Sequence, residues 1–395
     1  MIYNGAVLTP SGLLPDCSEL ANTILLREPG LIEVFSAEDI SQRIKSIVIT
    51  IVREGTSRTS DLIERLCARL ECKDEAKVVF IPLQGITLTE AVTQVGPFSL
   101  RRMDDEAIAE VDALWSAAID RTIDTPEQKA ASKKEFGAHL ESNLRGCVCL
   151  EVRLCADLIR AQTVAAEQAA ALIDLLRYGS SGLHRKDMNL AIGLKGDALP
   201  SLYSRYILPL GASDASNPTF RTGPFGTLVL DRESLQVMNS LGVQKLAGVL
   251  QRSTSQFEAT VLRAVHWFAE SRMQTRPEYE IVTLAIAVES ALAVPGQENH
   301  GRNILAEAVA VLLTESPVER RSLFDLTRTA LLNRGDVVHR GVDAVEWEGL
   351  KKFRNVVQRF ITATIHSIER FQTTAELLSW VGTKNSGLFV KGGRR

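Results

Sequence analysis

The chain has 395 residues, of which 45% are hydrophobic and 24% are charged, and its formal net charge is −3. This length predicts two or three domains, and the composition is typical of a globular protein. The slightly negative charge excludes a large, uniformly basic surface, so any contact with nucleic acid must be a local patch.

The apolar runs and the cysteines predict a protein of the reducing cytoplasm. The most apolar runs, such as IVTLAIAVESALAV, contain an acid and are too short to span a bilayer. The first residues lack the basic and apolar regions of a signal peptide. Cys147, Cys149 and Cys155 do not have C-x-x-C spacing, and no histidine stands at zinc-finger distance from a cysteine pair. We therefore expect free thiols, no metal, no cofactor and no membrane partner.

Residues 1–250 mix helical and strand patterns, which predicts an α+β region of one or two subdomains. Ser36 followed by acids is a typical helix start. The run KVVFIPLQGITL, at 77–88, reads as strand, turn, strand, because β-branched and aromatic residues flank a glycine. In chain order we expect helices at 36–55, 59–71, 104–120 and 164–178, a strand at 147–154, a flexible connector at 179–187, and short strands at 188–194, 204–210 and 226–231.

From about residue 250 the pattern becomes helical throughout. Apolar residues recur at helical spacing, and segments rich in proline and glycine separate the runs. We expect an all-α bundle over residues 251–375, followed by a tail at 376–395. Its predicted helical segments are 254–272, 278–294, 303–313, 316–334 and 342–371.

Several catalytic motifs are missing, and an arginine with a histidine remains as the candidate chemistry. The chain lacks G-x-S-x-G, the phosphate-binding loop and H-E-x-x-H. Arg334 and His339 form an R-x4-H arrangement. A histidine can exchange a proton with a ribose hydroxyl near neutral pH, and a guanidinium can bind a phosphate. The pair is therefore suited to cleaving RNA without a metal ion.

The spacing itself is common in this chain. With a slightly longer spacing, Arg177 with His184 and Arg359 with His366 also match. The first of these pairs flanks a loop-like, solvated segment, and the second lies along one face of a helix. Arg334 and His339 bracket Gly335, where a helix can end or bend.

Helix geometry limits how Arg334 and His339 can meet. Five residues of an ideal helix rotate by about 500°, which leaves the two side chains about 140° apart. They converge only if the helix breaks near Gly335 or if two copies of the chain pool their groups. A structural role is also open, because cationic residues are favoured at helix C-termini.

An ordered set of segments over roughly residues 253–375 resembles the HEPN superfamily, and in particular its ApeA-like branch. LAIAVESAL resembles the helix of that branch with an internal glutamate, here Glu289. NILAEAVAVLL resembles the next short helix, and LTRTALLNRGDVVHRG resembles the segment with the arginine and the histidine. A long helix then closes the domain, and the α+β region before it is similar to that family less specifically.

The resemblance implies a metal-independent endoribonuclease that leaves a 2′,3′-cyclic phosphate, in a prokaryotic anti-phage defence or toxin context. Arg334 would bind the scissile phosphate and His339 would act as acid and base. The site would form across a homodimer or higher homo-oligomer. The N-terminal region would sense an activating ligand or phage component, or restrain the nuclease. The supporting or substrate-binding candidates are Glu289, expected to pair with Arg334, and Asn333, Asp336 and Arg340.

A non-catalytic module is the alternative. Gly335 follows the arginine where many members of the family have a polar residue, and Arg340 separates His339 from Gly341. Under this interpretation the bundle dimerises, binds RNA without cutting it, or docks a partner.

Overall fold

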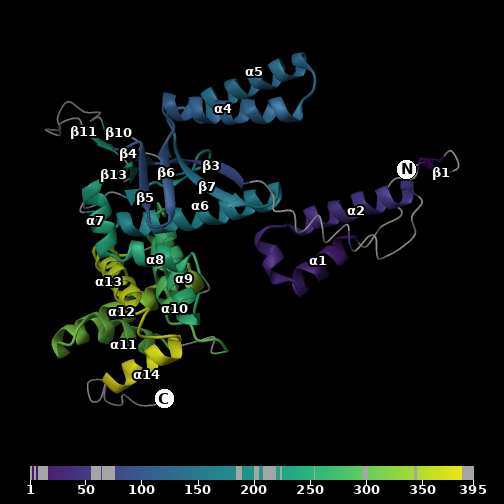
Figure 1. Cartoon of the computed structure of the whole chain (residues 1–395). Coiled ribbons are helices and arrows are strands. Elements are labelled where there is room, and N and C mark those ends of the chain that lie inside the picture. Colours follow the sequence, from purple (N-terminus) through teal and green to yellow (C-terminus); the bar gives the residue numbers. More distant parts are fainter. Residues whose placement is uncertain are drawn as a thin grey trace. The chain divides into compact units, whose positions relative to one another are not determined.

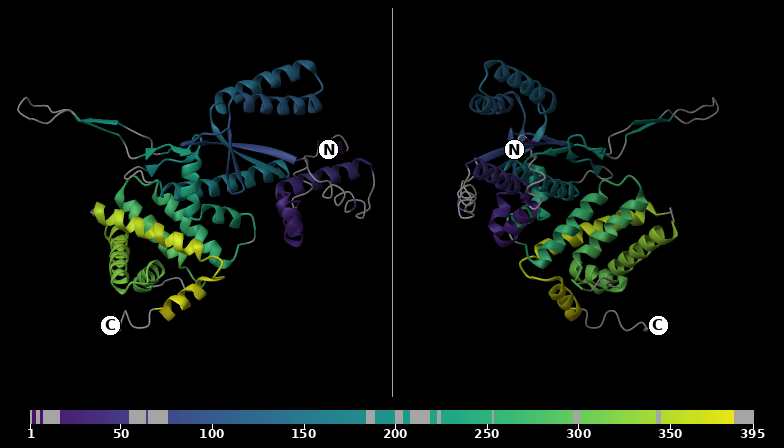
Figure 2. Two further views of the ribbon diagram at one scale, coloured as in Figure 1. Left: turned by 60° about the vertical axis from the view of Figure 1, so that its left-hand side comes forward. Right: turned by 90° about the vertical axis from the view of Figure 1, so that its right-hand side faces the viewer.

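The computed structural model describes residues 2–3, 6–7, 17–54, 64, 76–183, 189–199, 204–207, 219–222, 225–252, 254–296, 301–341 and 345–384 (Figures 1 and 2). Its contacts divide the chain into two units, and each is described by itself. One unit comprises Met1–Ile81 with Leu150–Ala169, and the other comprises Pro82–Cys149 with Ala170–Arg395. The predicted boundaries at residues 250 and 375 stay predictions.

The first unit contains a small helical core. Strands β1 (Ile2–Tyr3) and β2 (Ala6–Val7) pair, and α1 (Cys17–Arg27), the 3-10 helix η2 (Pro29–Glu33) and α2 (Ala37–Glu54) follow. The predicted helix start at Ser36 is confirmed, because its hydroxyl accepts a hydrogen bond from the Asp39 N–H. The buried side chains of this core are Cys17, Ala21, Phe35, Ile40, Ile44 and Ile47. The helix predicted at 59–71 lies outside the described residues, except for Glu64.

A single carboxylate joins two helix starts in this unit. Asp157 accepts hydrogen bonds from the backbone N–H of Ser36, before α2, and from those of Ile159 and Arg160. The last two belong to the first turn of α6 (Leu158–Ser180), whose orphan N–H groups need such an acceptor.

A five-stranded sheet has the order β5-β6-β7-β3-β9. The predicted strand-turn-strand is confirmed, because β3 is followed by β4 through Gly85, whose φ is 78°. A Cβ at Gly85 would lie 1.7 Å from the Ala191 carbonyl oxygen, so only glycine fits this turn. The strands are β3 (Ala76–Gln84), β4 (Ile86–Leu88), β5 (Val92–Val95), β6 (Phe98–Arg102), β7 (Val148–Cys155), β8 (Asn189–Leu190), β9 (Gly193–Leu194), β10 (Ser204–Ile207), β11 (Thr219–Thr222), β12 (Phe225–Gly226) and β13 (Leu228–Leu230).

A helical hairpin connects β6 to β7 (Figure 1). The first helix, α4 (Asp105–Thr122), was predicted, and Asp104 caps it by accepting the Ala107 N–H. The second helix, α5 (Pro126–Asn143), was missed, because Leu140 is its only buried residue and its sequence shows no apolar stripe. Trp115 and Phe136 stack between the two helices with ring centroids 4.1 Å apart.

The end of α6 is tied to the C-terminal helices by polar contacts within the second unit. The Tyr178 hydroxyl lies 2.9 Å from Thr362 Oγ1 and donates to the Leu241 carbonyl. Arg177 is buried and donates to Glu270 and to the Ile192 carbonyl. The segment 178–183 that follows Arg177 was predicted as a solvated loop. This prediction is wrong for Tyr178 to Ser180, which are helical and buried, whereas Ser181 to Leu183 are not helical. His184 lies outside the described residues.

The C-terminal helices occupy the predicted segments. Between α6 and these helices lie two short helices, α7 (Arg232–Ser240) and α8 (Val243–Val249), which the sequence pattern missed. The helices that follow are α9 (Gln256–Ser271), α10 (Pro277–Ala291), α11 (Arg302–Leu313), α12 (Pro317–Arg340) and α13 (Trp347–His366), and their core includes Phe257, Phe268, Phe353 and Phe360. Residues 374–384, within and just before the predicted tail, form α14 (Thr374–Lys384), whose Leu377 is buried. Within the described helices, no stretch combines the length and apolar character needed to cross a membrane.

Helix α12 does not break near Gly335, which corrects one of the two expectations for the Arg334–His339 segment. The helix runs through Gly335 and ends at Gly341, which has φ 63° and donates its N–H to the Val337 carbonyl. Glycine is disfavoured inside a helix but is tolerated there, whereas the left-handed end position specifically favours it. The left-handed glycine is therefore the true helix terminator.

Alanine substitutions at the two glycines of α12 should have opposite effects. Gly335→Ala should raise the free energy of unfolding by up to about 1 kcal/mol, because alanine has a higher helix propensity than glycine. A Cβ at Gly335 meets only the Arg302 Nη2 atom, at 4.0 Å. Gly341→Ala should lower the same free energy by about 1 kcal/mol, because its left-handed backbone strains an alanine. Denaturant unfolding of both variants measures this, and a destabilised Gly335→Ala would contradict the continuous helix.

The contact between α6 and α9 should contribute a pH-dependent stability. A hydrogen bond with Asp174, 2.8 Å from His266 Nδ1, raises the pKa of His266. Because the pKa is raised in the folded state, the stabilisation is complete below about pH 6.5 and is lost as the pH rises through the folded-state value. Asp174→Asn should therefore destabilise the protein more at acidic than at alkaline pH in denaturant titrations. Asp124→Asn, at an exposed turn, is the control. It should change the free energy of unfolding by the same amount at acidic and at alkaline pH.

Candidate functional site

Arg334 lies on the side of α12 that faces the bundle core. It continues the row of buried residues formed by Leu323, Thr327 and Ala330. Its Nη2 atom is 3.6 Å from Oε2 of Glu289 on α10, so the predicted pairing of these two residues is confirmed as an ion pair. The Arg334 side chain is 30% exposed and that of Glu289 is 39% exposed, so the pair lies at the edge of the core.

The Arg334 guanidinium has one unsatisfied group. Its Nε–H is buried and has no hydrogen-bond partner in the part of the chain that the structure describes. A buried donor without an acceptor costs about 1–3 kcal/mol. The side chain as a whole is 30% exposed, which leaves the guanidinium within reach of a phosphate oxygen.

His339 lies on a different side of α12 and is exposed. The helix is continuous between the two residues, so Arg334 and His339 point about 140° apart. The structure therefore does not bring them together within one chain. Of the two arrangements open from the sequence, the one that depends on a break at Gly335 is wrong, and a site shared between two copies stays a prediction.

The supporting candidates lie on further sides of α12. Asp336 forms an ion pair with Arg340, with 3.3 Å between Oδ1 and Nη1. Asn333 lines a pocket of about 340 Å³ between α12 and the start of α13, with Lys352 among the other residues of its wall. Asn333 therefore faces away from the Arg334–Glu289 pair, and Asp336 is engaged by its neighbour one turn later.

The sequence interpretation missed a group of residues beside His339. Arg328, Gly335 and His339 lie along one side of α12, because their spacing of seven and four residues returns to the same side of a helix. Arg328 and His339 are exposed, and Gly335 is half-buried. Arg302, at the start of α11, reaches over this side of α12 at Gly335. The spacing on α12 is readable from the sequence, but the approach of α11 is not.

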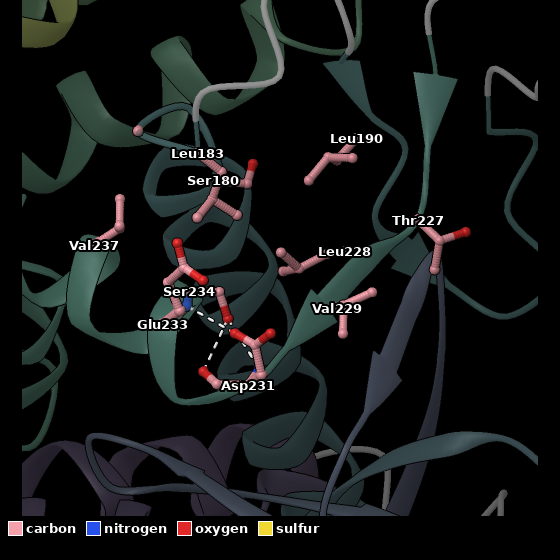
Figure 3. Close-up of a pocket in the computed structure, with 11 residues that line it drawn as sticks. Ser180, Leu183, Leu190, Thr227, Leu228, Val229, Asp231, Glu233, Ser234 and Val237 are labelled. Atoms are coloured by element: carbon pink, nitrogen blue, oxygen red, sulfur yellow. Dashed lines mark hydrogen bonds between the residues drawn. The ribbon is translucent and has the colours of Figure 1, made fainter.

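A second pocket, of about 300 Å³, lies where α6, β13 and α7 meet (Figure 3). Its carboxylate Asp231 caps α7 by accepting the Ser234 N–H, and the Ser234 hydroxyl in turn accepts the Asp231 N–H. The Ser234 N–H bond lowers the pKa of Asp231. The Asp231 carboxylate is therefore engaged in capping α7, and Glu233 is a second carboxylate in the wall of this pocket. Among the described residues, no cluster of histidine, cysteine and acidic side chains is arranged to hold a metal ion.

Comparisons with known proteins give no independent assignment. No protein-family model, no curated protein and no solved structure matches the chain. The resemblance to the HEPN superfamily therefore depends on the segments quoted from the sequence.

The Arg334–Glu289 pair should contribute little to stability, which keeps the arginine available to a ligand. A double-mutant cycle with Arg334→Ala and Glu289→Ala should give a coupling free energy below about 1 kcal/mol, because the pair is partly exposed and its atoms are 3.6 Å apart. Denaturant unfolding of the two single variants and the double variant measures it. A coupling of about 3 kcal/mol or more would indicate a structural pair that a phosphate cannot replace.

Proposed function

We propose that this chain is a metal-independent endoribonuclease of the HEPN type, with the C-terminal helices as its catalytic domain and His339 as its acid and base. The observation that carries the proposal is an exposed histidine on a continuous helix, about one turn from the Arg302 guanidinium, which has no acidic partner among the described residues. Its activity would belong to a defence or toxin system of the prokaryotic cytoplasm. The N-terminal region would respond to an activating ligand or phage component.

The reaction needs only proton transfer and charge stabilisation. A neutral imidazole removes the proton from a ribose 2′-hydroxyl, and the 2′-oxygen then attacks phosphorus. The bond from phosphorus to the 5′-oxygen breaks, and an imidazolium protonates that oxygen. The products are a 2′,3′-cyclic phosphate and a 5′-hydroxyl. A guanidinium that binds the non-bridging oxygens stabilises the charge that develops in the transition state.

A second copy of this chain is the proposed source of the arginine that acts together with His339. Arg334 and His339 of one chain diverge, so a site with both groups requires two chains. Val338 is 50% exposed on the helix that carries His339 and lies about 100° from His339 around the helix axis. An exposed apolar side chain beside a candidate site favours an interface, and a symmetric dimer would bring two copies of α12 together.

One observation favours a non-catalytic function. Glu289 forms an ion pair with Arg334, the residue that the resemblance assigns to binding the scissile phosphate. If this pair is retained in the assembled protein, the bundle binds RNA or a partner without cutting. Cleavage assays separate the two functions.

His339→Ala should reduce RNA cleavage by a factor of about 10² to 10⁴, the usual contribution of general acid–base catalysis. Purified protein is incubated with mixed single-stranded RNAs without metal ions, and the 3′ ends are tested for a cyclic phosphate. His366→Ala is the matched control, because His366 is also exposed near the end of a bundle helix. Equal cleavage by wild type and His339→Ala would exclude the proposed enzyme.

Mixing two inactive variants tests whether the site is shared. Dimers that contain one Arg334→Ala chain and one His339→Ala chain should recover activity only if the arginine and the histidine of a site come from different chains. If wild type cleaves RNA and the mixture stays inactive, then this arrangement is wrong.

A further inference from the structure

We propose that Arg302 and Arg328 form, with His339, a track that holds the phosphates of single-stranded RNA along α12. This inference rests on the proposed function, because it takes His339 as the point of cleavage. The inference adds the direction in which the RNA strand runs from His339. It also adds two RNA-binding residues that are not part of the R-x4-H pattern.

The three groups are aligned along one side of α12. Relative to Arg328, Gly335 and His339 lie within about 20° around the helix axis, and Arg328 to His339 spans about 16 Å along it. The Arg302 Nη2 atom lies 4.0 Å from the Cβ position of Gly335. It therefore occupies the gap between Arg328 and His339, about one helical turn from the histidine.

The charges of the track are not compensated. On α11, α12 and α13, the other exposed arginines pair with acids: Arg321, which lies on the same side of α12 as Arg328, with Asp325, Arg340 with Asp336, and Arg359 with Glu319. Arg302 has no acidic partner in the part of the chain that the structure describes. Arg328 has only a neutral one, because its Nε donates to Asn303 Oδ1 at 3.1 Å.

A phosphate strand is the occupant that fits these charges. Guanidinium groups bind phosphate oxygens in a planar, two-pronged geometry, and uncompensated ones attract a polyanion to a chain with a net charge of −3. A single strand carries one phosphate per nucleotide, so a track of about 16 Å covers more than one phosphate. Arginine contacts to phosphates fix position and do not read sequence. We therefore expect the track to hold single-stranded RNA without base preference.

Glycine at position 335 has a role in this arrangement. A long side chain there would project into the space that the Arg302 guanidinium covers. A carboxylate there would pair with Arg302 and neutralise it. Glycine at this position therefore leaves the Arg302 guanidinium without a competing side chain.

The test measures RNA binding in a background that cannot cleave. Fluorescence anisotropy with labelled, mixed-sequence single-stranded RNA gives the dissociation constant of the full-length His339→Ala protein over a series of salt concentrations. Adding Arg302→Gln or Arg328→Gln should weaken binding roughly tenfold at low salt, as expected for the loss of a charge-assisted hydrogen bond. Each substitution should also reduce the slope of log K against log salt by about 0.7, the value for one phosphate contact on a single strand.

Three further variants accompany these, and two of them are controls that should not change binding. Arg321→Gln removes an exposed arginine of the same helix that is already paired with Asp325, so affinity and slope should not change. Gly335→Glu should weaken binding as much as Arg302→Gln, whereas Gly335→Ala should leave it unchanged. Thermal unfolding followed by circular dichroism confirms that each variant is folded.

The outcomes separate this inference from the proposed function. If wild type cleaves RNA and His339→Ala does not, but Arg302→Gln and Arg328→Gln keep the affinity and slope of the background, then the track is wrong and the enzyme stands. If Arg321→Gln has the same effect as the track variants, or if the track variants lose dimerisation and keep RNA affinity, the track is likewise wrong. If the substitutions lower affinity and slope as expected while wild type never cleaves, the track stands and the catalytic proposal fails.

Discussion

The unbroken course of α12 determines where each candidate side chain lies. Each helical residue turns by about 100°, so Arg334 stays in the core-facing row and His339 in the exposed row. A glycine inside a helix costs about 1 kcal/mol relative to alanine. Burial of Leu323 and Leu331 on the same helix offsets that cost, because each fully buried leucine side chain contributes about 1.5–3 kcal/mol.

Charge pairing on the helix surface matters for recognition more than for stability. Exposed ion pairs such as Arg321–Asp325 and Arg340–Asp336 contribute at most about 1 kcal/mol each. Their effect on the field is larger, because the neighbouring carboxylate neutralises a paired arginine, whereas an unpaired arginine attracts anions within a Debye length of about 8 Å. Unpaired arginines therefore define where a polyanion is attracted, even on a chain whose net charge is slightly negative.

The sequence predicted the elements with strong periodicity and missed those without it. The helices from α9 to α13 and the strand-turn-strand at Gly85 were predicted because apolar residues recur there at regular spacing. Helix α5 was missed because the hairpin buries little more than Leu140 of it. The break expected at Gly335 was wrong because glycine alone does not end a helix whose flanking residues pack in a core, whereas Gly341 takes the left-handed conformation that does end it.

Only part of the candidate site could be predicted from the sequence. The pairing of Glu289 with Arg334 followed from the sequence resemblance, and the splay of Arg334 and His339 followed from helix geometry. The position of Arg302 did not, because it depends on how α11 crosses α12, which no local pattern encodes. Arrangements of charges between helices are set by packing, so they become visible only in three dimensions.

The buried Nε–H of Arg334 connects stability to function. Native proteins satisfy most buried donors, and the exceptions often lie at sites that need them for another purpose. Arg177 satisfies both its Nε–H and its Nη1 group, whereas Arg160 shares the unsatisfied buried Nε–H with Arg334. Arg334 has one distant ion pair and one unsatisfied donor. The Arg334 guanidinium is thus held in place while part of its hydrogen-bonding capacity stays unsatisfied. An anionic ligand or a second chain could supply the acceptors that this chain does not.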